Sequence, residues 1–183
     1  MFAKTIYMKN LILLAFILLS FTDLNSQEKQ NIKDRGYHVK VGDFVESFDM
    51  KLTSGEEISL SGFSGKVVVL QFTASWCSVC RKEMPALESE IWQEFKDKEF
   101  ILIGVDLDEP LDKVIEFKQK MKTTYPMALD PGGEIFQRFA YKGSGVTRNV
   151  VIDQEGNIAF LTRLYDHAEF NAMKSKIVEL LGK

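Results

Sequence analysis

Cysteine is scarce in this sequence. The 183 residues include only Cys77 and Cys80, and these two lie three positions apart. A secreted protein that is braced by disulfides usually carries several cysteines spread along its chain. A bridge between residues so close in sequence restricts little of the unfolded chain. The pair therefore indicates chemistry rather than bracing.

Histidine is equally rare, with only His38 and His167 in the chain. Tetrahedral zinc takes four ligands, and the two histidines and two cysteines show no recognisable zinc-site spacing. We expect each histidine to be a surface or structural residue. The sequence therefore predicts neither a bound metal nor a cofactor, and it favours redox chemistry for the cysteine pair.

Basic residues are not in excess. The chain has 23 Lys and Arg against 26 Asp and Glu, a net charge of −3. Binding to nucleic acid depends on clustered Lys and Arg that neutralise phosphates. We therefore expect no nucleic-acid partner.

The apolar run near the N-terminus is short. It covers residues 11–21 (LILLAFILLSF), follows Lys4 and Lys9, and is succeeded by polar residues. A helix that crosses a bilayer needs about 20 residues, whereas a charged start and a short apolar centre are typical of a signal peptide. We expect residues 1–26 to be a signal peptide, the alternative being an uncleaved anchor, and residues 27–36 to be a linker. The protein would then be periplasmic or otherwise exported, or tethered to the inner membrane by this segment.

Residues 37–183 are predicted to form one domain with one core. Short strands and a hairpin turning at Ser54-Gly55 are expected before an apolar strand at 66–73. A helix from the cysteines to about residue 95, a strand at 100–105 and a helix at 110–122 follow. In the helix at 110–122 the expected inward residues are Leu111, Val114, Ile115 and Met121.

The end of the chain reads as a short strand at 126–129, a brief helix through residue 139, two antiparallel strands at 149–153 and 158–164, and a final helix. Asp166 and Glu169 resemble a capping box at the start of that helix. Strand–helix–strand followed by helix–strand–strand–helix predicts an α/β sandwich with a mixed central sheet.

The cysteine pair lies where the strand at 66–73 gives way to a helix. At a helix N-terminus, free backbone N–H groups and the positive end of the dipole stabilise a thiolate at Cys77. Cys77 is therefore the predicted nucleophile, and Cys80 would resolve the mixed disulfide that forms with a partner. Glu83 lies three residues past Cys80 and can share its helix face, although a solvated surface glutamate is the alternative.

The segments GKVVVLQFTAS, WCSVCRKEMP and GVTRNVVIDQEGNI together resemble the thioredoxin superfamily, most closely the exported TlpA/ResA-type thiol–disulfide oxidoreductases (a redoxin or AhpC-TSA-like domain). The resemblance implies a thioredoxin-like three-layer sandwich with an N-terminal β-hairpin extension. It also implies that Trp76 packs beside the dithiol, that Glu83 handles the proton of Cys80, and that Val146 and Thr147 face the dithiol and contact the partner peptide.

By the same resemblance, the function would be that of a disulfide reductase. Its partners would be oxidised exported proteins, such as apocytochrome c, and its electrons would come from a membrane-bound thiol donor.

Two positions depart from the family pattern. Thr147 follows Gly145-Val146 where the family places a cis-proline, and the four prolines, at 85, 110, 126 and 131, cannot replace it. Because a cis bond before threonine costs about 3 kcal/mol, we expect a trans bond. Gln71 stands where thioredoxin has a buried aspartate, so the proton acceptor would be Glu83 or water. Arg148 either favours a thiolate or is solvated.

Two other functions stay open at this point. A peroxiredoxin-like thiol peroxidase would share the fold, but such enzymes place Thr or Ser three residues before the reactive cysteine, where this chain has Ala74. A non-catalytic thioredoxin-fold carrier would follow if Thr147 impaired turnover.

Overall fold

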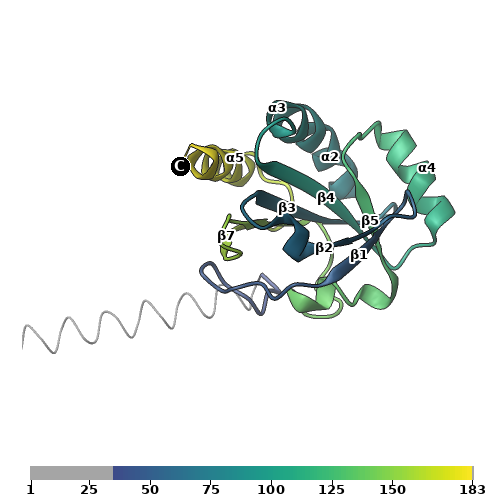
Figure 1. Cartoon of the computed structure of the whole chain (residues 1–183). Helices are drawn as coiled ribbons and strands as arrows, with labels where there is room; N and C mark the ends of the chain where they lie inside the picture. The colour runs from purple at the N-terminus through teal and green to yellow at the C-terminus, as the bar shows by residue number, and fades with distance from the viewer. Residues whose placement is uncertain (1–34, 183) are drawn as a thin grey trace, which may run out of the picture.

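A mixed seven-stranded sheet forms the middle layer of the structure, a computed structural model that describes residues 35–182 (Figure 1). The expected signal peptide and residues 27–34 of the expected linker lie outside the described residues. The strand order is β2-β1-β5-β4-β3-β6-β7. The strands are β1 Asp49–Leu52, β2 Glu57–Ser59, β3 Val67–Thr73, β4 Phe100–Leu107, β5 Met127–Asp130, β6 Arg148–Ile152 and β7 Ile158–Leu161.

The α-helices cover one face of this sheet. They are α2 Ser78–Ala86, α3 Gln93–Phe95, α4 Leu111–Met121 and α5 His167–Leu181, with a π-helical stretch, η2 Leu87–Trp92, between α2 and α3. Their apolar side chains form one core cluster with β3 and β4. Within residues 35–182, no helix combines the length and apolar character that crossing a membrane requires.

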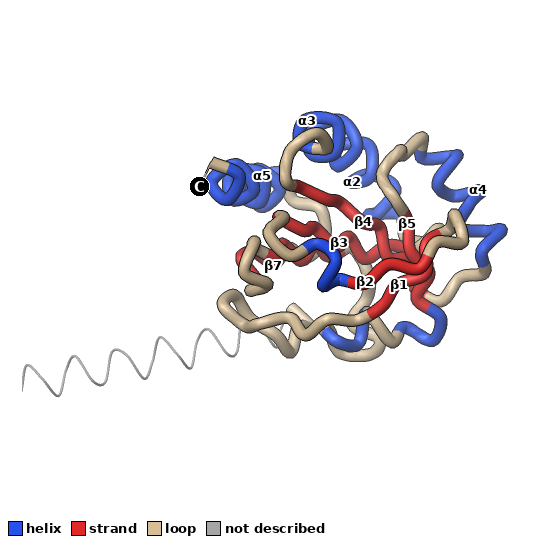
Figure 2. Tube along the Cα trace, viewed as in Figure 1, coloured by secondary structure: helices blue, strands red, loops and turns tan. Residues whose placement is uncertain are grey.

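The opposite face has no long helix in the described part of the chain. It is covered by residues 37–48 and by the 3₁₀ helices η1 Leu60–Phe63, η3 Pro131–Gly133 and η4 Phe136–Arg138, which build a second core cluster (Figure 2). The sheet and its two coverings make the three layers. The predicted thioredoxin-like fold is confirmed.

The predicted N-terminal hairpin is also present. β1 and β2 pair antiparallel, with Met50 opposite Ile58, and β1 then pairs antiparallel with β5. The hairpin therefore extends one edge of the sheet instead of lying apart from it. Its buried side chains, Met50 and Leu52, point into the second cluster.

The expected inner face of α4 is partly wrong. Val114 is buried, but Leu111 and Ile115 are 45% and 37% exposed. Phe117 is the buried partner of Val114 instead. Each residue advances about 100° around a helix, so the face that buries this large ring turns positions 111 and 115 toward solvent.

The predicted capping box of α5 is half formed. The Asp166 side chain accepts from the backbone N–H of Glu169 at 2.9 Å. The Glu169 carboxylate turns away, accepting from the backbone N–H of Arg163 at 2.9 Å and pairing with Arg35 at 2.5 Å. Its charge thus fixes the chain before β1 against the start of α5.

The sheet topology brings distant residues to one edge. β3, β4 and β5 run parallel and end together, while β6 runs antiparallel to β3 and begins at that same edge. Phe72 pairs with Arg148. As a result, Thr147, just before β6, lies beside the residues that follow β3.

Candidate active site

Cys77 is the N-cap residue of α2, as predicted. Its sulfur accepts from the backbone N–H of Cys80 at 3.1 Å, and a disulfide joins the two residues with 5.3 Å between their Cα atoms. Cys77 is 8% exposed, whereas Cys80 is completely buried. Of the two residues, only Cys77 therefore keeps any surface that a partner can reach.

The loop before the pair is tied down by charged side chains. The Glu109 carboxylate accepts from both the backbone N–H and the hydroxyl of Ser75, the latter at 2.7 Å, and pairs with Lys113 at 2.6 Å. From the other side, Arg81 donates to the carbonyl of Ser75 at 2.6 Å. This clamp fixes the strand-to-helix turn, so the position of Cys77 does not depend on α2 alone.

Trp76 lies next to the pair but points outward, with 59% of its surface exposed. It borders a cavity of about 430 Å³. Much of the cavity wall is formed by glycines, which contribute no side chains. Leu107, Phe136 and Lys142 form other parts of the wall. An extended partner segment has room for a side chain here.

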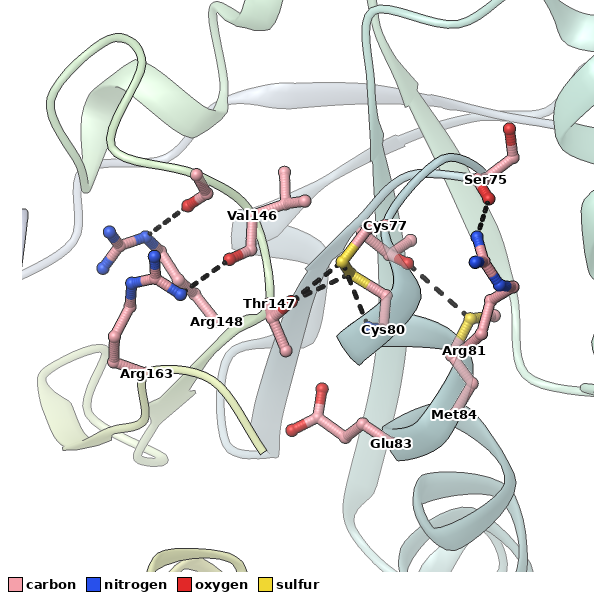
Figure 3. The surroundings of a disulfide bond; sticks show 12 residues. Ser75, Cys77, Cys80, Arg81, Glu83, Met84, Val146, Thr147, Arg148 and Arg163 are labelled. Atoms are coloured by element: carbon pink, nitrogen blue, oxygen red, sulfur yellow. Dashed lines mark hydrogen bonds between the residues drawn. A yellow bond between two sulfur atoms is a disulfide. The ribbon is translucent and has the colours of Figure 1, made fainter. Parts of the chain in front are cut away.

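Thr147 faces the cysteine pair from the side opposite helix α2. Its hydroxyl oxygen lies 3.0 Å from the sulfur of Cys77 and 3.1 Å from that of Cys80 (Figure 3). No cis peptide bond occurs within residues 35–182, so the bond before Thr147 is trans, as expected. The φ angle of Thr147 is +57°. The threonine thus faces both reacting atoms.

Two arginines hold the loop that leads to Thr147. Arg148 is fully buried and donates to the carbonyls of Gly145 and Ser144, each at 3.0 Å. Arg163 donates to the carbonyl of Val146 at 3.2 Å (Figure 3) and to that of Ser144 at 3.1 Å. A solvated Arg148 is excluded by this burial.

The chain before β1 is part of the same assembly. Arg148 donates to the carbonyl of Arg35 at 2.7 Å and stacks over the ring of Tyr37 at 4.4 Å. The hydroxyl of Tyr37 donates to the carbonyl of Thr162 at 2.5 Å. A Cβ added to Gly36 would lie 2.6 Å from Ser144, so only glycine fits there.

Glu83 is buried on the inner side of α2. One of its oxygens accepts from Asn149 at 2.8 Å; the other has no hydrogen-bond partner among residues 35–182. Burial raises its pKa to about 7, against the opposing effect of the Asn149 hydrogen bond. The alternative of a solvated surface glutamate is excluded, and Glu83 can take up or release a proton near neutral pH.

Gln71 lies in the same buried region, at the middle of β3, and accepts from the hydroxyl of Tyr125 at 2.8 Å. Gly104 on β4 leaves room for the Tyr125 ring, since a Cβ there would lie 3.2 Å from it, closer than ordinary van der Waals contact. An amide does not titrate, so Glu83 is not coupled to a second buried acid at this position.

Sequence reasoning missed Asp106, Glu109 and Asn149. Asp106 is fully buried near the end of β4, and neither carboxylate oxygen has a hydrogen-bond partner in the described part of the chain. Burial, reinforced by the nearby Glu109, raises its pKa to about 8. For Asp106 the sequence does offer a signal, because an acidic residue follows the apolar run of the strand that lies next to β3.

No cluster of three or more His, Cys, Asp or Glu within residues 35–182 could hold a metal ion.

Comparison with known proteins agrees with this geometry. Residues 41–161 match the AhpC/TSA family. The thiol-disulfide oxidoreductase ResA of Bacillus thuringiensis is 32% identical over 129 residues, which cover 68% of this chain and 73% of that relative.

Two solved structures are also similar. The solution structure of a candidate protein disulfide isomerase from Bacteroides thetaiotaomicron is 51% identical, with a TM-score of 0.79 over 81% of this chain and 94% of that one. The crystal structure of a candidate thiol:disulfide interchange protein DsbE from Chlorobium tepidum is 27% identical, with a TM-score of 0.70 over 79% and 99%. The chain belongs to the AhpC/TSA family and is a thiol–disulfide oxidoreductase of the TlpA/ResA type within the thioredoxin superfamily.

Proposed function

We propose that this protein is an exported protein-disulfide reductase that works through a mixed disulfide. The observation that carries this proposal is the unequal access of the two sulfurs. Cys77 lies at the N-cap of α2 and reaches the surface, whereas Cys80 is completely buried behind it. Such an arrangement suits one attacking sulfur and one that reacts only within the protein.

The reaction begins with the reduced pair. The Cys77 thiolate attacks one sulfur of a partner disulfide; that S–S bond breaks, and the other partner sulfur leaves as a thiolate and takes a proton. Cys80 then loses its proton and attacks the Cys77 sulfur. The partner's remaining sulfur leaves, and two electrons have passed from the pair to the partner.

Glu83 is the proposed acceptor for the Cys80 proton. It lies on the buried face of α2, one turn beyond Cys80, and its pKa of about 7 lets it exchange a proton at neutral pH. Trp76, Val146 and Thr147 are the proposed contacts for the partner segment, with the cavity beside Trp76 receiving one of its side chains.

Export, partners and electron donor extend the proposal. Residues 1–26 would direct the chain across the membrane or tether it there. The partners would be oxidised exported proteins, apocytochrome c among them, and a membrane-bound thiol protein would return electrons to the pair. Fractionation of cells that express the full chain tests the location, since recovery in the cytoplasmic fraction would contradict it.

The activity is tested by reduction of insulin or a small disulfide by the reduced protein. We expect Cys77→Ala to abolish it and Lys82→Ala, a change at an exposed position on α2, to leave it intact. Cys80→Ser should trap mixed disulfides with exported proteins through Cys77. Activity that survives in Cys77→Ala would rule out the mechanism, and peroxide reduction faster than disulfide reduction would favour a peroxidase.

Direction is decided by the reduction potential of the pair, measured by equilibration with glutathione or dithiothreitol. A value near thioredoxin's, about −270 mV, agrees with a reductant; one near DsbA's, about −120 mV, would make the protein an oxidant.

A further inference from the structure

Among residues 35–182, the Thr147 hydroxyl is the only side-chain hydroxyl within hydrogen-bonding distance of both sulfurs. Its oxygen lies 3.0 Å from Cys77 and 3.1 Å from Cys80, and the residue is 2% exposed. The family pattern has proline at this position, and proline carries no side-chain donor. The substitution therefore brings a new polar group to the reacting atoms.

The backbone holds Thr147 where its hydroxyl meets both sulfurs. Its N–H donates to the carbonyl of Phe72 at 3.1 Å, and its own carbonyl accepts from Leu164 at 2.9 Å. A φ of +57° is unfavourable for a β-branched residue. Such a conformation persists only where its surroundings enforce it, and it is common at functional sites.

The arginine contacts described above supply that enforcement from the preceding loop. Arg148 and Arg163 between them bind the carbonyls of residues 144, 145 and 146. The loop cannot relax without breaking these contacts. The hydroxyl is thus presented to the sulfurs by a fixed backbone.

We propose that Thr147 bridges the reduced pair: its O–H donates to the Cys77 thiolate, and its oxygen accepts from the S–H of Cys80. This inference rests on the proposed function, in which Cys77 is the attacking thiolate. A hydroxyl has one hydrogen to donate and two lone pairs to accept, so one group satisfies both roles. The backbone N–H of Cys80 is the second donor to the same sulfur.

The bridge favours the reduced state. In the disulfide neither sulfur carries a hydrogen, so the hydroxyl can only donate, and disulfide sulfur is a weak acceptor. A thiolate is charged, and hydrogen bonds to charged groups are about twice as strong as neutral ones. Thr147 is therefore a catalytic residue that raises the fraction of thiolate at Cys77 and makes the pair a weaker reductant than it would be without the hydroxyl.

The test compares Thr147→Val with Thr147→Ser in the full chain. Valine keeps the size and branching of threonine but loses the hydroxyl, whereas serine keeps the hydroxyl. The rate at which iodoacetamide alkylates Cys77 in the reduced protein, followed against pH and located by mass spectrometry, gives the pKa of that thiol. Thermal unfolding of the oxidised variants checks the fold, and Thr147→Ala replaces the valine variant if that one does not fold.

In Thr147→Val we expect the pKa of Cys77 to rise by about one unit, so that alkylation below both pKa values slows about tenfold. The equilibrium with glutathione should shift toward the disulfide by up to tenfold, or about 30 mV more negative. Thr147→Ser should stay close to the wild type in both measurements. The ionisable groups on the surrounding elements are the same in all variants: Arg81 and Glu83 on α2, Asp106 on β4, Glu109 before α4, Arg148 on β6 and Arg163 after β7.

The outcomes separate this inference from the proposed function. If wild-type Cys77 is activated but Thr147→Val leaves its pKa unchanged, the inference about Thr147 is wrong and the proposed function stands. Equal shifts in the valine and serine variants would also overturn it, since they would reflect packing. If wild-type Cys77 titrates as an ordinary thiol near about 8.5, both the bridge and the activated nucleophile are wrong.

Discussion

At the residue scale, the character of the site comes from which buried groups can titrate. Glu83 has one oxygen bound by Asn149, and burial raises its pKa to about 7. Gln71, where thioredoxin has an acid, contributes only an amide. Glu83 is therefore the carboxyl group that we propose as the acceptor of the Cys80 proton, and its loss should be visible in one step of the reaction.

Replacing Glu83 by Gln should slow the resolution of the mixed disulfide by roughly 100-fold at pH 7, because a positioned base typically contributes at least this much. In the wild type the rate of resolution should rise with pH and level off above about pH 7, since only the ionised carboxylate accepts a proton. The measurement is single-turnover release of a partner thiol after rapid mixing.

Glu90→Gln, a change at an exposed position of η2, is the matched control and should match the wild type. An unaltered pH profile in Glu83→Gln would mean that water, not Glu83, accepts the proton of Cys80.

At the element scale, the turn between β3 and α2 depends on a side chain from a later part of the chain. Glu109 lies just before α4, yet it binds both the backbone N–H and the hydroxyl of Ser75. Hydrogen bonds to charged groups contribute about 1.5–3 kcal/mol each. The start of α4 therefore contributes to the position of Cys77, although the two are not neighbours in sequence.

Glu109→Ala should lower the free energy of unfolding by about 1–3 kcal/mol, because it leaves the Ser75 N–H without its partner and Lys113 without its ion pair. Glu116→Ala, at an exposed position of α4, should change it by less than about 0.5 kcal/mol. Urea unfolding of the oxidised proteins measures both values. Equal effects of the two changes would show that the clamp does not stabilise the turn.

Elements were predicted well where one local signal decided them. The apolar run of β3, the cysteine cap of α2 and the Asp166 cap of α5 each depend on residues close in sequence. The inner face of α4 was not predicted correctly. Phe117 competes with Leu111 and Ile115 for a place in the core, and only the neighbours packed against the helix decide which side chains are buried. The contacts of Asn149 and Glu109 arise from strand pairing and helix placement, which no local pattern encodes.

At the scale of the whole molecule, two buried acids influence how stability depends on pH. The pKa values of Glu83 and Asp106 are raised to about 7 and about 8 in the folded protein, while in the unfolded chain they lie near 4. Between these limits the folded state binds more protons than the unfolded state. Their contribution to stability is complete below about pH 4 and is lost as the pH rises toward 7 and 8.

We therefore expect the free energy of unfolding of the oxidised wild type to fall, relative to the double variant Glu83→Gln, Asp106→Asn, by up to about 1.4 kcal/mol per pH unit for each group. Chemical denaturation at pH 4, 6 and 8 measures the difference. A difference that stays constant over this range would mean that both carboxyl groups keep ordinary pKa values in the folded protein.

The antiparallel placement of β6 has a consequence for how the protein is made. Sixty-seven positions separate Cys80 from Thr147, and ribosomes add about 5–20 residues per second. The cysteines therefore leave the ribosome several seconds before the threonine that contacts them. During that interval the nascent chain carries both thiols without the Thr147 residue that later faces them, and any oxidant present can react with them.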